Sequence, residues 1–334
     1  MTGQKDSKPK QFVMSRRIKV VGFGGGTGLP TLLSGLKRNP WLEVTAIPTM
    51  FDTGGSSGEL AHRFGVLPFG DALKCIIALS SDEEAAAKLL LRRISHRASP
   101  GHTAGNILLL GLEKVFGDFM TAVNVLGQIV SSVGVVYPVA LSQSTLCAEF
   151  EDQTTLRGET SIDIGIFEGK RVKRLFLDPP VPSNELALNA IRKADVFCVG
   201  PGSFYTSVLS NFLPEGVRAE IKASSAPVVF TSNLLTEGYG MNGFTARGMT
   251  EILEAYIDRC VSKVIVNTRV PQERLEAYAE ERKYPLSWHD TGEDDKFILA
   301  DLWFDARLAR HDTERLSYLM SQVIYDLVRE KLAQ

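Results

Sequence analysis

The sequence contains few cysteines and histidines, and neither type is arranged as a metal site. Its four cysteines, Cys75, Cys147, Cys198 and Cys260, are far apart in the 334 residues and form no C-x-x-C pair. The five histidines include no i,i+4 pair. Because zinc and redox sites need closely spaced ligands, we expect no structural zinc and interpret the cysteines as buried free thiols.

The sequence also lacks an excess of charge of one sign and any long apolar run. Its net charge is −2 with 23% charged residues, so nucleic acid is not an expected partner. No 18 apolar residues follow one another, and residues 1–17 lack the apolar segment of a signal peptide. We expect a cytoplasmic protein without membrane insertion, with a disordered leader at 1–17 and a single α/β domain at 18–334.

Glycine is abundant and gathers in loops after apolar runs. The strand predicted at 18–22 leads into a loop that precedes a helix predicted at 30–37. Such a loop and the following helix N-terminus can hold a phosphate with backbone N–H groups. A P-loop is excluded because no lysine lies between Val20 and Lys37, and the dinucleotide fingerprint is only approximated. A tight turn without ligand is the alternative. The candidate residues are Gly24, Gly25, Gly26, Thr27 and Gly28.

The order of the remaining segments predicts a Rossmann-like α/β fold with a doubly wound, mostly parallel sheet. Further strands are expected at 43–50, 195–199, 227–231 and 263–267. A helical segment is inserted at 71–130, with helices at 72–79, 83–94, 104–115 and 119–129, and a β-rich segment follows at 133–177 with turns at 151–153 and 167–170.

A second glycine-rich loop follows the strand predicted at 43–50. Its phosphate-binding candidates are Gly54, Gly55, Ser56 and Ser57. Asp52 and Asp71 supply hard oxygen ligands suited to Mg²⁺, and we expect both carboxylates in one pocket. Equally weighted alternatives are an Asx turn at Asp52 and a helix N-cap at Asp71.

Two more loops follow predicted strands, at the sheet edge where open α/β proteins place ligands. The third loop repeats the glycine pattern and offers Gly200, Gly202, Ser203 and Thr206. In the fourth, Asn233 is a candidate for recognising a base or ribose, or else satisfies its own turn. His102 precedes a helix and is interpreted as a capping or packing residue, with a catalytic base as the alternative.

These segments together resemble the YvcK-like proteins, often labelled gluconeogenesis factors, of the CofD superfamily. The motifs are Gly24–Gly28, Asp52–Gly58, Gly65–Asp71, Gly105-Asn106, Gly200–Ser207 and Asn233–Thr236. The resemblance implies a cytoplasmic regulatory protein that binds a nucleoside diphosphate or UDP-sugar, such as UDP-N-acetylglucosamine, and supports gluconeogenic growth and cell shape. The alternative that it implies is a CofD-type 2-phospho-L-lactate transferase, acting with Mg²⁺ on a deazaflavin. An NAD-dependent dehydrogenase is disfavoured because Asp52 lies inside a glycine loop.

The chain departs from the YvcK pattern at several positions. Four segments differ from the acidic or basic residues that are usual there: Thr53, Glu59–Ala61, Met241–Gly243 and Arg247-Gly248. The acidic cluster of CofD is reduced to Asp52 and Asp71. We therefore expect nucleotide binding without phospholactyl transfer. The sequence leaves open the identity of the sugar or base and whether the protein turns over a substrate. It also leaves open the oligomeric state, for which a homodimer is one option.

Overall fold

A seven-stranded parallel sheet forms the centre of the protein in this computed structural model, which describes residues 16–52, 54–94, 101–305 and 308–332. The strand order is β12-β11-β10-β9-β1-β2-β5, and every neighbouring pair is parallel. The predicted doubly wound sheet is confirmed. The strands are β1 Ile18–Gly24, β2 Leu42–Pro48, β5 Val135–Val136, β9 Val196–Val199, β10 Val228–Thr231, β11 Lys263–Asn267 and β12 Phe297–Ala300.

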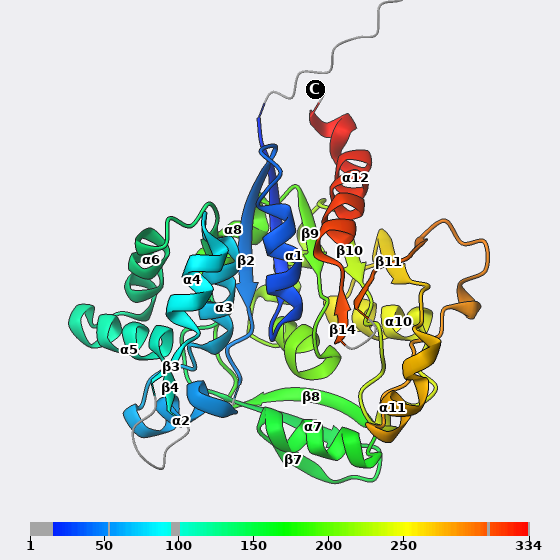
Figure 1. The fold of residues 1–334 in the computed structure, drawn as a ribbon, viewed down its shortest axis with the longest axis horizontal. Coiled ribbons are helices and arrows are strands. Elements are labelled where there is room, and N and C mark those ends of the chain that lie inside the picture. Colours follow the sequence, from blue (N-terminus) through cyan, green and yellow to red (C-terminus); the bar gives the residue numbers. More distant parts are fainter. Residues whose placement is uncertain (1–15, 53, 95–100, 306–307, 333–334) are drawn as a thin grey trace, which may run out of the picture.

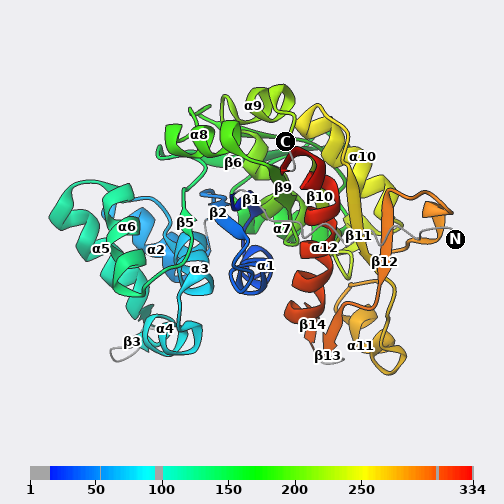
Figure 2. The ribbon, with the colours of Figure 1, turned by 90° about the horizontal axis from the view of Figure 1, so that it is seen from above.

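Helices cover both faces of this sheet (Figure 2). One face carries α1 Gly28–Leu36, α3 Gly70–Leu79 and α12 Thr313–Leu332, and the other carries α8 Glu185–Lys193, α9 Val217–Ala223 and α10 Ala246–Ile257. Every residue of β9 and β10 is buried, as expected for central strands covered on both sides. From β1 the chain runs outward to β2 and β5 and then returns to β9 on the other side, so the strand order reverses between β1 and β9.

The inserted helical segment contains α2 Gly55–Phe64, α4 Glu83–Leu90, α5 Ala104–Phe116 and α6 Phe119–Ile129, together with the short hairpin of β3 Arg93–Ile94 and β4 His102–Thr103. Side chains of Asp82, Thr103 and Asp118 cap the helices that follow them. The helix predicted at 83–94 was too long, because α4 ends at Leu90 and Arg93–Ile94 pair as a strand. Asp71 lies inside the first turn of α3 and is not its N-cap.

A small antiparallel sheet lies beyond the carboxyl ends of the parallel strands (Figure 1). Its order is β7-β6-β8, with β6 Thr145–Phe150, β7 Thr155–Arg157 and β8 Val172–Asp178. Between β7 and β8 stands a helix that the sequence analysis missed, α7 Glu159–Glu168. Ile162, Ile164 and Ile166 alternate with other residues as in a strand, which favoured the wrong prediction. The turn expected at 167–170 ends this helix.

The last part of the chain returns to the sheet edge. Helix α11, Leu275–Glu280, is followed by β12 and by an antiparallel hairpin of β13 Trp303–Asp305 and β14 Leu308–His311. Helix α12 then packs beside α1, where a Cβ atom on Gly35 would overlap Ser317. The hairpin therefore lies close to the loop that begins α1.

Three of the four cysteines are buried as predicted, but Cys260 is exposed and corrects that expectation. Of the predicted leader 1–17, residues 1–15 lie outside the described residues, and Arg16 forms an ion pair with Asp195 at 2.5 Å. Among the described residues, no helix combines the length and apolar character needed to cross a membrane.

Candidate functional site

Two glycine loops meet at the point where the strand order reverses. In the first, between β1 and α1, Gly26 has φ +59°, and a Cβ atom on Gly25 would lie 2.5 Å from Asp71 Oδ2. A Cβ atom on Gly28 would overlap the carbonyl oxygen of Pro201 in the loop after β9. The glycines of the first loop are therefore required by close packing as well as by backbone conformation.

Two asparagines hold the loops together. Asn211 donates from Nδ2 to the carbonyl oxygens of Gly24, at 3.0 Å, and Ser207, at 2.7 Å. Asn233 donates from Nδ2 to the carbonyl oxygen of Gly202 at 2.9 Å, and its buried Oδ1 accepts no hydrogen bond from the residues that the structure describes. The third loop continues into a single π-helical turn, Phe204–Val208, which directs Ser207 toward the first loop.

A cavity of about 430 Å³ opens above the two loops. Six predicted residues line it, namely Gly26, Thr27, Gly28, Gly202, Ser203 and Asn233. Four other predicted residues lie in the same two loops but do not line the cavity, namely Gly24, Gly25, Gly200 and Thr206. The N–H of Gly200 donates to the carbonyl oxygen of Phe23, and the side chain of Thr206 is buried, with 2% exposure. Other lining residues come from the fourth loop, the segment after α11 and β14.

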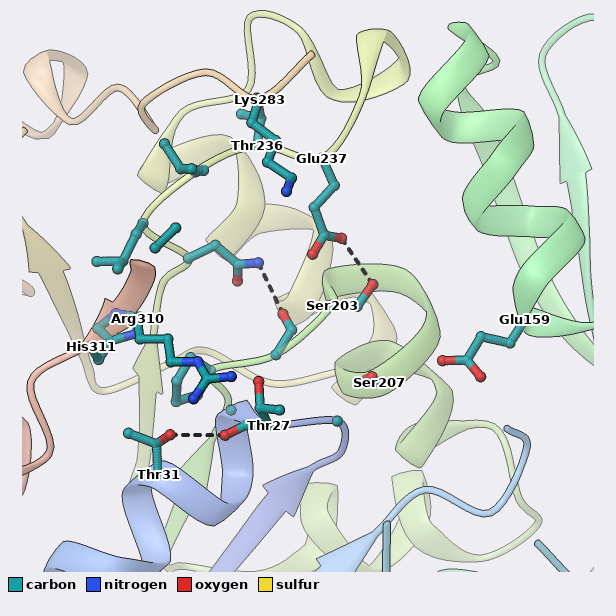
Figure 3. Close-up of a pocket in the computed structure, with 18 residues that line it drawn as sticks. Thr27, Thr31, Glu159, Ser203, Ser207, Thr236, Glu237, Lys283, Arg310 and His311 are labelled. Atoms are coloured by element: carbon teal, nitrogen blue, oxygen red, sulfur yellow. Dashed lines mark hydrogen bonds between the residues drawn. The ribbon is translucent and has the colours of Figure 1, made fainter. Parts of the chain in front are cut away.

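Two cations face this cavity, and the sequence analysis identified neither. Arg310 extends from β14 toward Thr27, and Lys283 reaches in from the segment after α11 (Figure 3). Lys283 pairs with Glu281 at 2.8 Å, whereas Arg310 has no ion pair within the described part of the chain. Both side chains come from segments remote in sequence from any glycine loop, so no local pattern connects them with the site.

The second glycine loop lies outside this cavity, and its polar groups are used within the protein. Ser57 Oγ accepts the N–H of Gly70 at 2.8 Å. Ser56 Oγ lies 3.0 Å from His102 Nδ1 and accepts Asn106 Nδ2 at 3.2 Å. Gly54 donates its N–H to Asp52 Oδ1 at 2.7 Å, the Asx turn named as an alternative, and Gly55, with φ +57°, begins α2.

Asp71 supports the first loop from below. Its Oδ2 accepts the N–H of Gly26 at 2.9 Å, and its Oδ1 pairs with Lys74 at 2.9 Å. Burial lowers the pKa of Lys74, but the neighbouring Asp71 outweighs it and raises that pKa overall. Asp71 is 5% exposed, and both of its oxygens are committed to protein groups.

Asp52 lines a second cavity, of about 470 Å³, and is hydrogen-bonded to Glu159, which lines the first. Both Asp52 and Asp71 act electrostatically on Lys74 and on Glu159, so they belong to one cluster of charges. Within the residues that the structure describes, no three acidic, histidine or cysteine side chains are placed to hold a metal ion.

Three further carboxyl groups surround the third loop. Burial raises the pKa of Glu159 to about 10, and its hydrogen bond to Asp52 adds to this effect. Burial also raises the pKa of Asp163 to about 7, with a contribution from Glu237, and burial raises the pKa of Glu237 itself. Glu159 and Asp163 lie on α7, where the alternating pattern of the sequence predicts strands instead of a helix.

The substituted positions of the family pattern lie elsewhere. Arg247 pairs with Asp294 at 3.2 Å, and Met241–Gly243 is not among the cavity-lining residues. Glu59 lies 4.0 Å from His102, and Thr53 falls outside the described residues. The described departures are not among the residues that line the cavity.

Fold and site define a Rossmann-like α/β protein with its cavity at the switch point of a parallel sheet. The sequence model of the family described as "2-phospho-L-lactate transferase CofD" matches residues 20–299. The chain belongs to the CofD family.

Relatives and solved structures agree with this assignment. A protein from Thermotoga maritima is 40% identical over 265 residues, covering 79% of this chain and 83% of that protein. The "Gluconeogenesis factor" of Bacillus subtilis is 32% identical over 330 residues, covering 95% of this chain and all of its own length (100%). The crystal structure of a UPF0052 family member from Bacillus halodurans superposes with a TM-score of 0.85 at 33% identity, covering 92% of this chain and 99% of that one. The chain is thus similar to gluconeogenesis factors over most of its length.

Proposed function

We propose that this protein binds a nucleotide-sugar such as UDP-N-acetylglucosamine and acts as a regulatory protein of gluconeogenic growth and cell shape. The observation that carries the proposal is the convergence of a helix N-terminus, two glycine loops and two cations on one cavity of about 430 Å³. A nucleoside diphosphate needs both an anion-binding end and a polar end of this kind.

The diphosphate would lie between α1 and Arg310. Helix α1 has no side-chain cap and no acidic residue in its first turn, so its N-terminus attracts an anion. The N–H of Gly26 is occupied by Asp71, which leaves the N–H groups of Thr27 and Gly28 as the donors. Arg310 can clamp two phosphate oxygens from the open side, and Lys283 adds a point charge.

The opposite wall suits a group that donates hydrogen bonds. The carboxyl group of Glu237 lies there, and among the described residues Asn233 Oδ1 has no hydrogen-bond partner. Ribose and sugar hydroxyls are donors that such acceptors recognise. Arg310 beside Thr27 and the carboxyl group of Glu237 face different parts of the cavity, which supports one orientation of the ligand.

The second candidate is a phospholactyl transferase. The cavity beside Asp52 favours it, because the hydrogen-bonded Asp52 and Glu159 stand between that cavity and the first one, where an acceptor could meet an activated donor. The family description favours it too. Against it, Asp71 is committed to Gly26 and Lys74. Arg310 also lies beyond residue 299, outside the segment that the CofD sequence model matches.

Calorimetric titration with UDP-N-acetylglucosamine, GDP and NAD separates the candidates. We expect saturable binding of the UDP-sugar and weaker binding of the other two. A parallel assay with Mg²⁺, a deazaflavin acceptor and guanylyl-activated phospholactate is read by mass spectrometry. Multiple turnovers in that assay, lost in Asp52→Asn, would establish the transferase instead.

A further inference from the structure

A chain of four side chains connects α7 with the cavity. Glu237 Oε2 lies 2.9 Å from Ser203 Oγ, and Ser203 Oγ lies 2.9 Å from Thr206 Oγ1. Thr206 Oγ1 lies 3.1 Å from Asp163 Oδ1 on α7. Ser203 and Glu237 line the cavity, where the Ser203–Glu237 contact is visible in Figure 3, whereas Thr206 is buried beneath them. A carboxyl group therefore ends the chain on each side.

The number of hydrogen atoms available to these four side chains shows that one carboxyl group is protonated. It contains three hydrogen bonds, but the two hydroxyl groups supply only two hydrogens. An ionised carboxylate can only accept, so the third hydrogen must come from a protonated carboxyl at one end. With the proton on Asp163, every hydroxyl hydrogen points toward Glu237. With the proton on Glu237, every one points toward Asp163.

We propose that Asp163, Thr206, Ser203 and Glu237 share one proton, and that a phosphate binds at Ser203 when this proton sits on Glu237. The inference rests on the proposed function, because it concerns how the same cavity accepts an anion. In the Glu237-protonated state, Glu237 donates to Ser203 Oγ, and on ligand binding Ser203 turns its single hydrogen from Thr206 Oγ1 to a phosphate oxygen. Thr206 still donates to Asp163, and the neutral carboxyl of Glu237 presents no negative charge at the cavity wall to repel the phosphate.

The charges around these four side chains favour the retention of one proton among them. Asp163 faces the carboxyl of Glu237 and that of Asp52, and burial with these neighbours raises its pKa to about 7. Burial raises the pKa of Glu237, and the positive charge of Lys283 opposes this effect. The other charged or titratable groups of the cluster and cavity wall are Glu159, Asp71, Lys74, Arg310 and His311. Burial lowers the pKa of His311 to about 4, so this imidazole stays neutral when the chain titrates.

The consequence is proton-linked binding with a defined sign. Below pH 7 the four hydrogen-bonded side chains already hold the shared proton, and ligand binding only moves that proton from Asp163 to Glu237. Above pH 7 the proton is lost from the free protein and must be taken up again on binding. The dissociation constant should therefore stay constant below pH 7 and rise about tenfold for each pH unit above it.

UDP-N-acetylglucosamine is the suitable probe, because its diphosphate diester lacks the secondary phosphate ionisation near pH 6. Titrations from pH 6 to 9 are run on the full chain and on two isosteric variants. Glu237→Gln fixes a donor at the cavity end, so binding should keep its pH 6 strength at every pH. Asp163→Asn fixes a donor at the other end, so binding should be weak throughout. Glu168→Gln, on the exposed face of α7, should leave the wild-type profile unchanged.

Opposite effects of these two amide substitutions are the distinguishing result, since a merely structural role would weaken binding in both. A flat wild-type profile, or equal losses in both variants, would overturn the proposal. If the wild type binds no UDP-sugar even at pH 6, the proposed function fails, and the shared proton is tested on the free protein. There, the Asp163 carboxyl followed by ¹³C NMR should titrate near pH 7, and an ionised Asp163 at pH 6 refutes the shared proton.

Discussion

Gly28 packs directly against the carbonyl oxygen of Pro201, so the first and third glycine loops touch through their backbones. The contact joins segments that leave adjacent strands, β1 and β9. It fixes the floor of the cavity before any ligand arrives, and it explains why a glycine pattern seen in sequence has a packing role in addition to an anion-binding one.

Gly28→Ala should therefore destabilise the protein by about 1–3 kcal/mol, because the added methyl group overlaps rigid backbone. Urea unfolding measures this change. Gly111→Ala in α5 is the control: among the described residues, no atom outside the backbone of its own helix lies within 4 Å of the added Cβ, and that variant should gain roughly 0.5–1 kcal/mol. Equal stability of the two variants would contradict the close contact.

Asp71→Asn should loosen the first loop. The substitution removes the charge that pairs with Lys74 and weakens the acceptor for the Gly26 N–H. We expect a loss of about 1–3 kcal/mol in the free energy of unfolding, as for a buried charged partner. Glu84→Gln, which breaks an exposed pair with Lys88, should change stability by less than about 0.5 kcal/mol. A loss of the same size in both variants would contradict the supporting role of Asp71.

Arg310→Gln should weaken UDP-sugar binding tenfold to about a hundredfold while leaving the thermal unfolding temperature unchanged. The range corresponds to hydrogen bonds between a charged donor and phosphate, and the side chain is exposed in the free protein. Calorimetry and thermal unfolding provide the two measurements. Arg38→Gln, another exposed arginine that pairs with Glu314, serves as the control and should bind normally. Undiminished affinity in Arg310→Gln would place the diphosphate elsewhere.

Stability should fall as the pH rises from 5 to 8. The pKa of Asp163 in the folded protein is raised to about 7, whereas the unfolded chain releases this proton near pH 4. Between these values the folded state binds more protons, so raising the pH favours unfolding by about 1 kcal/mol per unit for this group. Asp163→Asn should show a shallower decline in urea unfolding from pH 5 to 8. A slope as steep as that of the wild type would show that Asp163 is not the group responsible.

Five of the seven strands were predicted because apolar runs mark them, and glycine loops follow three of these, β1, β2 and β9. The loops after β1 and β9 were placed correctly on one edge, and Asn233 was found beside them. Helix α7 was missed because Ile162, Ile164 and Ile166 alternate as in a strand. Arg310 and Lys283 could not have been found from sequence, because only the tertiary fold brings β14 and the segment after α11 to the first loop.

The hairpin of β13 and β14 also determines when the cavity becomes complete during synthesis. All seven parallel strands have been made once the chain reaches Ala300, yet Arg310 and His311 come later. A nascent chain that has formed its whole central sheet still lacks one wall of the cavity. The arginine that we propose to clamp the phosphates is therefore added last, and a growing chain should bind that ligand more weakly than a finished molecule.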